Sequence, residues 1–165
     1  FGDLVNVNGE TGAFSSSTRA IFGSGVVGPG RVSKIDYVTI STLGNSVNFG
    51  DITVARGGLA GCSNAVRGLF AAGYSPLQNL IDYVTISALG NAIDFGDLTQ
   101  ARAYPGACSS PTRGVWGGGY TPNDKTPVNT MDYVTIMSTG DAVDFGDLTV
   151  SRFIVHACSN GHGGL

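Results

Sequence analysis

Apolar and polar residues alternate over short stretches of the chain. Residues 80–87 read Leu-Ile-Asp-Tyr-Val-Thr-Ile-Ser, the interleaved pattern of a partly buried strand. Three other short stretches surround it, with turn residues such as Ser75-Pro76 between them. No segment has the spacing of an amphipathic helix. The pattern predicts four strands, at 58–63, 67–74, 80–87 and 92–98.

This group of four predicted strands recurs along the chain. A hexapeptide, Ile/Met-Asp-Tyr-Val-Thr-Ile, begins at Ile35, Ile81 and Met131, so the period is 46 residues and then 50. A second motif, Phe-Gly-Asp followed by Leu or Ile, begins at four positions, Phe1, Phe49, Phe95 and Phe145. A four-stranded unit of about 40 to 50 residues is the size of one β-propeller blade, and such units must stack to bury their faces.

The repeats predict an all-β fold in one repeat domain, residues 1–165. It contains about three four-stranded antiparallel units, each the size of a propeller blade. The predicted units cover 1–48, 49–94 and 95–144, with a partial unit at 145–165. Since propellers usually have about 4 to 8 blades, three units predict an incomplete ring or part of a larger assembly. The chain also begins inside a recurring motif, which we interpret as a processed chain or a fragment.

Several residues recur in every unit and are interpreted as structural anchors. The aromatic side chains are expected to fill the gaps between neighbouring blades. Each arginine follows an aspartate by five residues, and the aspartate is expected to cap a turn or to pair with an arginine across blades. A catalytic site needs one special constellation, whereas these residues are repeated. The anchors are Phe49, Phe95, Phe145, Arg56, Arg102 and Arg152, and the aspartates are Asp51, Asp97 and Asp147.

A second set of arginines, Arg19, Arg67 and Arg113, follows the Phe-Ser or Cys-Ser step of each unit. Two interpretations stay open for them. They form a basic ring at one mouth of a propeller, or they donate to backbone carbonyls between strands.

Composition and charge narrow the classes of partner. The chain is 42% hydrophobic and 13% charged, with 26 glycines and a net charge of -3. Nine Lys and Arg residues form no basic stripe, so we expect no nucleic-acid partner. No apolar run approaches the roughly 20 residues that span a bilayer, so we expect no membrane span.

The three cysteines, Cys62, Cys108 and Cys158, sit at one position of successive repeats. They lack CxxC spacing and a nearby histidine pair, so we expect no metal site and no cofactor. We interpret them as small buried residues of a protein made in a reducing cytoplasm.

The residues that could carry catalysis are few. Ser159 and His162 form a conceivable nucleophile pair, but Gly161, Gly163 and Gly164 surround them, which is a poor setting for a preorganised site. The sequence therefore predicts no catalytic residue and no enzyme activity.

Connections that differ between repeats are better candidates for binding. They cover 26–32, 75–79 and 121–130, and the third is the longest. The binding residues predicted on and beside them are Tyr74, Tyr104, Tyr120, Asn123, Asp124 and Lys125.

One order of features links the chain to a known repeat. A small-residue strand (58–63) precedes an apolar strand (69–74), and Tyr83, the aromatic anchor Phe95 and Arg102 follow. This order resembles the kelch repeat over nearly the whole chain, which implies kelch-like β-propeller blades. Two departures are that Gly-Gly occurs fully only at residues 118–119, and that the anchor is Phe instead of the family's usual Trp.

The repeated phrase Asp-Tyr-Val-Thr-Ile, followed by Asp-Phe-Gly-Asp-Leu-Thr, is also similar to repeats of virion structural proteins of tailed phages, especially marine ones. This resemblance implies a non-enzymatic structural or fibre component on the surface of a virion or extracellular particle. Its partners would be other protein chains, through self-association or a larger assembly, and a host surface receptor or glycan. The alternatives are a cytoplasmic kelch-like interaction scaffold and a carbohydrate-binding propeller.

Overall fold

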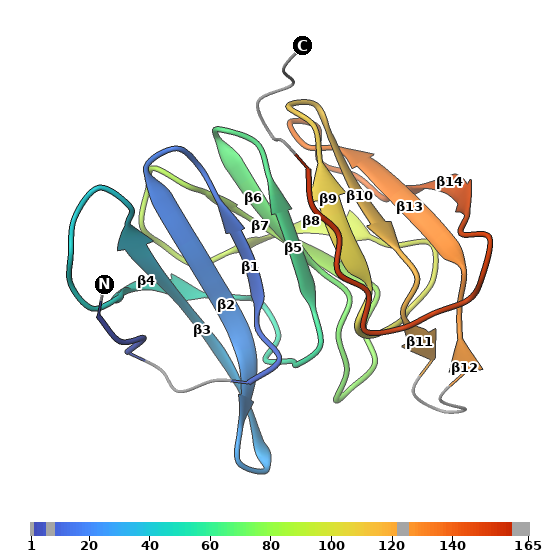
Figure 1. The fold of residues 1–165 in the computed structure, drawn as a ribbon, viewed down its shortest axis with the longest axis horizontal. Coiled ribbons are helices and arrows are strands. Elements are labelled where there is room, and N and C mark those ends of the chain that lie inside the picture. The colour runs from blue at the N-terminus through green and yellow to red at the C-terminus, as the bar shows by residue number, and fades with distance from the viewer. Residues whose placement is uncertain (1, 6–8, 122–125, 160–165) are drawn as a thin grey trace.

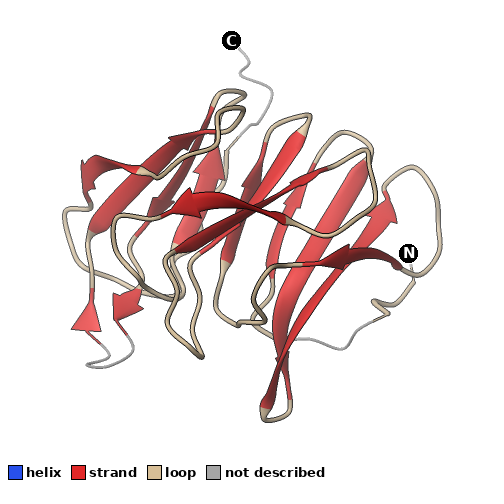
Figure 2. Ribbon diagram, turned by 180° about the vertical axis from the view of Figure 1, so that it is seen from behind, coloured by secondary structure: helices blue, strands red, loops and turns tan. Residues whose placement is uncertain are grey.

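The computed structural model describes residues 2–5, 9–121 and 126–159. Every regular element in these ranges is a β-strand, and they form three four-stranded antiparallel sheets and one two-stranded ribbon (Figures 1 and 2). The all-β prediction is therefore confirmed. Among the described residues there is no helix of the length and apolar character that a membrane crossing requires.

Each four-stranded sheet is built mainly from strands that are consecutive in the chain. The first sheet contains β1 (Gly12–Ser15), β2 (Arg19–Val27), β3 (Gly30–Thr39) and β4 (Val47–Asp51). The second contains β5 (Ala60–Ser63), β6 (Arg67–Ala71), β7 (Leu80–Thr85) and β8 (Ile93–Asp97). The third contains β9 (Gly106–Ser109), β10 (Arg113–Gly117), β13 (Thr130–Thr135) and β14 (Val143–Asp147). The ribbon pairs β11 (Tyr120–Thr121) with β12 (Thr126–Pro127).

Two details differ from the sequence-based expectation. Phe49 and Phe95 lie in β4 and β8, the last strands of their sheets, so each sheet extends past the end of a predicted repeat unit. The connection expected at 26–32 is largely strand, because β2 and β3 stay paired out to Val27 and Gly30. Gly28, with a φ of 55°, allows the tight turn between them.

The three sheets lie side by side, with their first strands β1, β5 and β9 next to one another (Figure 1). Small residues are required where neighbouring sheets approach. A Cβ atom on Gly68 would overlap the ring of Phe14, and one on Gly23 would overlap the ring of Phe70. The phenyl rings of adjacent sheets therefore occupy the space that these glycines leave.

Two apolar cores fill the gaps between the sheets. In the first, residues of β1–β4 such as Phe14, Ile21 and Phe49 pack with Phe70 and Val84 of the second sheet. The second core repeats this arrangement one unit along the chain. It includes Cys62, Leu69, Ile81, Phe95 and Leu98 from one side and Trp116, Val134, Ile136 and Ala142 from the other.

The described residues form an open stack instead of a closed ring (Figure 1). An open stack leaves the outer face of its last sheet uncovered, and the exposed fractions of the three phenylalanine anchors reflect this. Phe49 and Phe95 are each 3% exposed between two sheets, whereas Phe145 is 48% exposed. The expectation that these residues fill gaps holds for the first two and not for Phe145, because no further described sheet covers that side of β14.

Buried ion pairs join adjacent sheets, but with partners other than those expected. Arg56 lies 2.8 Å from Asp82, and Arg102 lies 2.6 Å from Asp132, with all four side chains 0% exposed. These carboxylates belong to the Asp-Tyr-Val motif of the next sheet, whereas Asp51 accepts a hydrogen bond from Ser33. Arg152 is exposed, because no following described sheet supplies the equivalent aspartate.

The second set of arginines also crosses between sheets. Arg19 donates to the carbonyl of Ile86 (2.7 Å), and Arg67 donates to the carbonyl of Ile136 (3.3 Å). Each guanidinium also stacks on a tyrosine ring of its own sheet, such as Tyr37 beneath Arg19 at 4.6 Å. Of the two interpretations left open, donation to backbone carbonyls is the one observed for these two residues.

Candidate binding site at one end of the sheet stack

Four residues in the left-handed backbone conformation mark one end of the stack. Glu10, Gly58, Tyr104 and Ile154 have φ values of 59°, 67°, 55° and 55°. Glu10, Gly58 and Tyr104 lie just before β1, β5 and β9, and Ile154 lies in the C-terminal segment after β14. Their backbones form a chain of hydrogen bonds across the sheets: Gly58 donates to Glu10 (3.1 Å), Tyr104 to Gly58 (2.7 Å) and Ile154 to Tyr104 (3.2 Å). We call this set the left-handed ladder.

The backbone at the ladder positions favours glycine, yet three of the four residues carry side chains. Glycine adopts a positive φ at little cost, and Gly58 holds that position in the middle of the ladder. A side chain at the same φ costs on the order of 1–2 kcal/mol. Glu10, Tyr104 and Ile154 are therefore retained at positions where the backbone favours glycine.

The tyrosines predicted as binding residues lie together at the ladder. The ring of Tyr104 lies between those of Tyr74, at 5.5 Å, and Tyr120, at 5.6 Å between centroids. Phe153 extends the row beyond Tyr120 (5.5 Å), and Arg31 covers the opposite end over Tyr74 (4.6 Å). The other predicted binding residues, Asn123, Asp124 and Lys125, fall outside the described residues.

Glu10 and the tyrosine hydroxyls form a polar edge along this aromatic row. The hydroxyl of Tyr74 donates to Oε2 of Glu10 at 2.7 Å. Burial raises the pKa of Tyr104, and interactions with Glu10 and Tyr74 raise it further. Burial also raises the pKa of Tyr120. These phenols therefore remain neutral hydrogen-bond donors at physiological pH.

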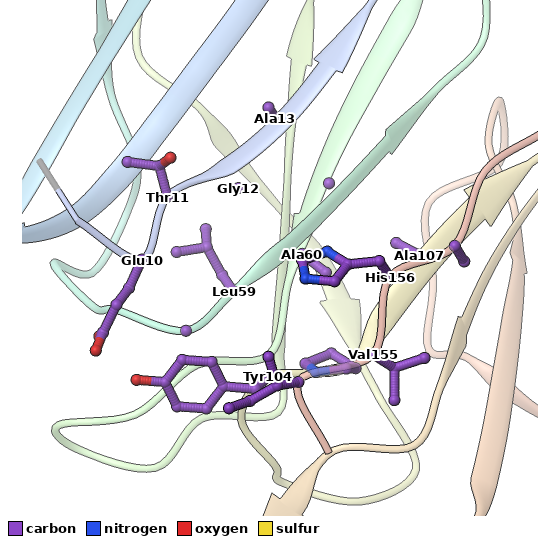
Figure 3. A pocket seen from close by; sticks show the side chains of 15 residues that line it. Glu10, Thr11, Gly12, Ala13, Leu59, Ala60, Tyr104, Ala107, Val155 and His156 are labelled. Atoms are coloured by element: carbon purple, nitrogen blue, oxygen red, sulfur yellow. The ribbon is translucent and has the colours of Figure 1, made fainter. Parts of the chain in front are cut away.

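A hollow of about 420 Å³ lies against the ladder (Figure 3). All four ladder residues line it, together with the starts of β1, β5 and β9. In Figure 3 the Glu10 carboxylate and the Tyr104 hydroxyl lie on the same side of the hollow, and the imidazole of His156 lies beyond Leu59. The volume falls within the range of small-molecule binding sites, roughly 300–1,000 Å³.

A second hollow, of about 600 Å³, lies at the other end of β1, β5 and β9. Serines connect the strands there, since Ser63 Oγ donates to the Ser15 carbonyl and Ser109 Oγ to the Ser63 carbonyl, each at 2.7 Å. The cysteines also line it, and their exposure rises from buried Cys62 through Cys108 to exposed Cys158. Burial raises the pKa of the Cys62 thiol, so this cysteine is a packing residue and not a nucleophile.

The residues considered for catalysis are not brought together in the described parts of the chain. His156 is exposed at the first hollow, whereas Ser159 serves a structural contact by accepting from the Ser109 amide at 3.2 Å. His162 falls outside the described residues. Within the described ranges there is also no group of three metal-ligating side chains.

Sequence reasoning found the tyrosines but missed Glu10, Arg31 and Phe153. Glu10 stands one repeat before Gly58, but the two residues are chemically unlike, so the sequence does not show that their positions are equivalent. Their equivalence is visible only in the shared backbone conformation and in the hydrogen bond between them.

Comparison with known proteins adds no relative to this description. No protein-family model matches the chain, and no curated protein matches it.

Proposed function

We propose that the chain is a non-enzymatic structural module of propeller-type blades that associates through its end sheets. The observation that carries this proposal is the end face of the third sheet, on which Phe145 is exposed and its apolar neighbours are only partly buried. Its residues occupy the same repeat positions as five buried residues of the second core. The end face consists of Cys108, Val115, Met131, Phe145 and Leu148, equivalent to Cys62, Leu69, Ile81, Phe95 and Leu98.

A second copy of the chain carries the complementary surface. Phe70, Val84 and Ile86 of the second sheet are at most 3% exposed where they pack on the first sheet. Phe22, Val38 and Ile40 stand at the same positions of the first sheet, and Ile40 is 41% exposed. Pairing the end face of one copy with this surface of another would reproduce both internal interfaces. Such head-to-tail contacts generate rings or filaments.

This mode of association supports a role as a virion structural or fibre component. Virus particles are assembled from rings and filaments of repeated units. The repeated sequence phrase is also similar to that of tailed-phage virion proteins. The corresponding location is the surface of a virion or extracellular particle. Locating the chain in purified particles tests this part of the proposal, and its absence from them would contradict it.

Two variants test the association itself. Phe145→Asp damages the end face, and Ile40→Asp damages the complementary surface. We expect the unmodified chain to form species above 16.9 kDa as concentration rises, and each variant alone to remain at 16.9 kDa in light-scattering measurements. A mixture of the two variants retains one intact pairing, so it should form a dimer and nothing larger.

Leu43→Asp is the matched control, since Leu43 is 83% exposed in a turn and belongs to neither surface. It should associate like the unmodified chain. A chain that stays at 16.9 kDa at every concentration would refute self-association.

A further inference from the structure

The last described residues of the chain continue the course by which one sheet leads into the next. Residues 49–63 run from the last strand of the first sheet into the first strand of the second, and residues 95–109 do the same between the second and third. Residues 145–159, which we call the trailing segment, leave the third sheet in the same way, but no described sheet follows for them to enter.

The trailing segment lies where the first strand of a further sheet would begin. Ile154 continues the left-handed ladder through its hydrogen bond to Tyr104. The Ser109 amide donates to Oγ of Ser159 (3.2 Å), as the Ser63 amide donates to Oγ of Ser109 (3.4 Å). The segment therefore runs along β9 (Figure 1), and its other edge has no described strand beside it.

The N-terminal segment, residues 1–15, is the counterpart of the trailing segment at the first sheet. The two align without a gap, with Ala-Phe-Ser at 13–15 and Ala-Cys-Ser at 157–159. β1 lies in the N-terminal segment and pairs with β2 along its whole length. When two copies meet end to end, β1 of one and the trailing segment of the other would occupy the same position. The end surfaces can therefore join only if one of these segments gives way.

Each buried aspartate of an ion pair is held by two residues of the segment that leads into its sheet. Asp82 of the second sheet accepts a hydrogen bond from Thr53 at 2.6 Å and pairs with Arg56 at 2.8 Å. The third sheet repeats this arrangement one unit along the chain. A segment that matches such an aspartate thus carries a threonine and, three residues later, an arginine.

The trailing and N-terminal segments differ at these two positions. Thr149 and Arg152 occupy them in the trailing segment. Val5 and Asn8 occupy them in the N-terminal segment. Asp36, which stands at the equivalent position of the first sheet, is 3% exposed. The trailing segment therefore carries the threonine and arginine that match Asp36, and the N-terminal segment carries neither.

We propose that the trailing segment of one copy replaces the N-terminal segment of the next, so that copies are joined by strand exchange. The end of the trailing segment then pairs with β2 of the second copy, and Arg152 pairs with its Asp36. Main-chain hydrogen bonds supply affinity in strand addition, and alternate side chains supply specificity. Such exchange rests on the association proposed for the end sheets, and it names the segment that each copy contributes.

Glu10 reports the release of the N-terminal segment. It is the single glutamate of the sequence. In the structure its carboxylate accepts from the Tyr74 hydroxyl at 2.7 Å, and its carbonyl accepts from the Gly58 amide at 3.1 Å. A glutamate-specific endopeptidase cuts a released, extended chain, so the rate of cleavage after Glu10 follows the population of released segments.

The test adds a synthetic peptide of residues 145–159 to the full chain, under reducing conditions and below the concentration at which larger species form. The peptide contains no glutamate, so the endopeptidase leaves it intact. We expect about 1 mM peptide to raise the rate of cleavage after Glu10 at least ~10-fold, because it captures the first sheet whenever the N-terminal segment leaves. Mass spectrometry records the cleavage.

The matched control is the same peptide with Thr149→Val and Arg152→Asn, which gives it the residues of the N-terminal segment. A ~10-fold weaker Kd should limit its effect on the cleavage rate to less than about twofold. Strand exchange is overturned if the unmodified peptide leaves the cleavage rate unchanged, or if the two peptides act equally.

Light scattering separates this result from the association itself. Larger species that form while the peptide leaves cleavage unchanged would support the proposed association and overturn strand exchange. A chain that stays at 16.9 kDa at every concentration, yet is cut faster with the peptide, would refute the joining of copies although its first sheet accepts the segment.

Discussion

Arg56 and Arg102 are large charged residues with no exposure, each held by an aspartate of the next sheet. Burial lowers the pKa of Arg102, and the charge of Asp132 counteracts this effect. Thr99 also donates to Asp132, so the carboxylate is held from two directions. Removing one partner of an ion pair in this setting would leave a buried charge without a partner.

We therefore expect Asp132→Ala to lower the free energy of unfolding by about 3–5 kcal/mol, since it leaves the Arg102 guanidinium buried and uncompensated. Urea denaturation measures the change. Arg152→Met is the control, because Arg152 stands at the repeat position of Arg102 but is exposed, and it should change stability by less than about 0.5 kcal/mol. Equal losses in the two variants would show that the buried pair has no special role.

At the scale of strands and sheets, the stack depends on a face of each sheet that only its neighbour can cover. β8 carries Phe95 into the second core, where it meets Tyr83 edge-on at 5.9 Å between centroids. β14 carries Phe145 in the same geometry with Tyr133, at 5.8 Å, but without a covering sheet. The local pairing is thus retained, and only the contact between sheets is lost.

This pair of phenylalanines allows a controlled comparison. Phe95→Ala should cost about 3–5 kcal/mol because it opens a cavity between two sheets. Phe145→Ala should cost much less in the monomeric chain, because its side chain is 48% exposed. Denaturation of both variants in urea measures the difference. A loss below about 1 kcal/mol for Phe95→Ala would contradict its role in the second core.

The sequence predicted the elements of each sheet well but not their cross-sheet partners. Period-2 alternation and repeated motifs located β5 to β8 to within about three residues. Alternation cannot reveal that Arg56 reaches Asp82, because Arg56 lies in the connection between β4 and β5 and Asp82 lies in β7, far along the chain. The left-handed ladder was equally hidden, since a positive φ at Glu10 has no signature in residue type.

At the scale of the whole molecule, each sheet packs only on its neighbours. The second sheet has both faces covered, whereas the first and third each have one face that no other described sheet covers. Local stability in such arrays depends on the number of neighbours. Amide hydrogen exchange should therefore be slowest in β6 and β7 and faster in the equivalent strands β2, β3, β10 and β13. Uniform exchange across the three sheets would contradict this view.

The N-terminal segment has a consequence for the rate of any association. The amide of Ser46 donates to the Asp3 carbonyl (2.9 Å), just as that of Ala92 donates to the Asp51 carbonyl (2.8 Å). Residues 1–4 and 145–148 share the sequence Phe-Gly-Asp-Leu. Residues 145–148 of a second copy would therefore compete with the N-terminal segment for the same position beside the first sheet. Joining of two copies then has to wait for the resident segment to leave. Removing residues 1–5 should speed the approach to equilibrium, which time-resolved light scattering would record.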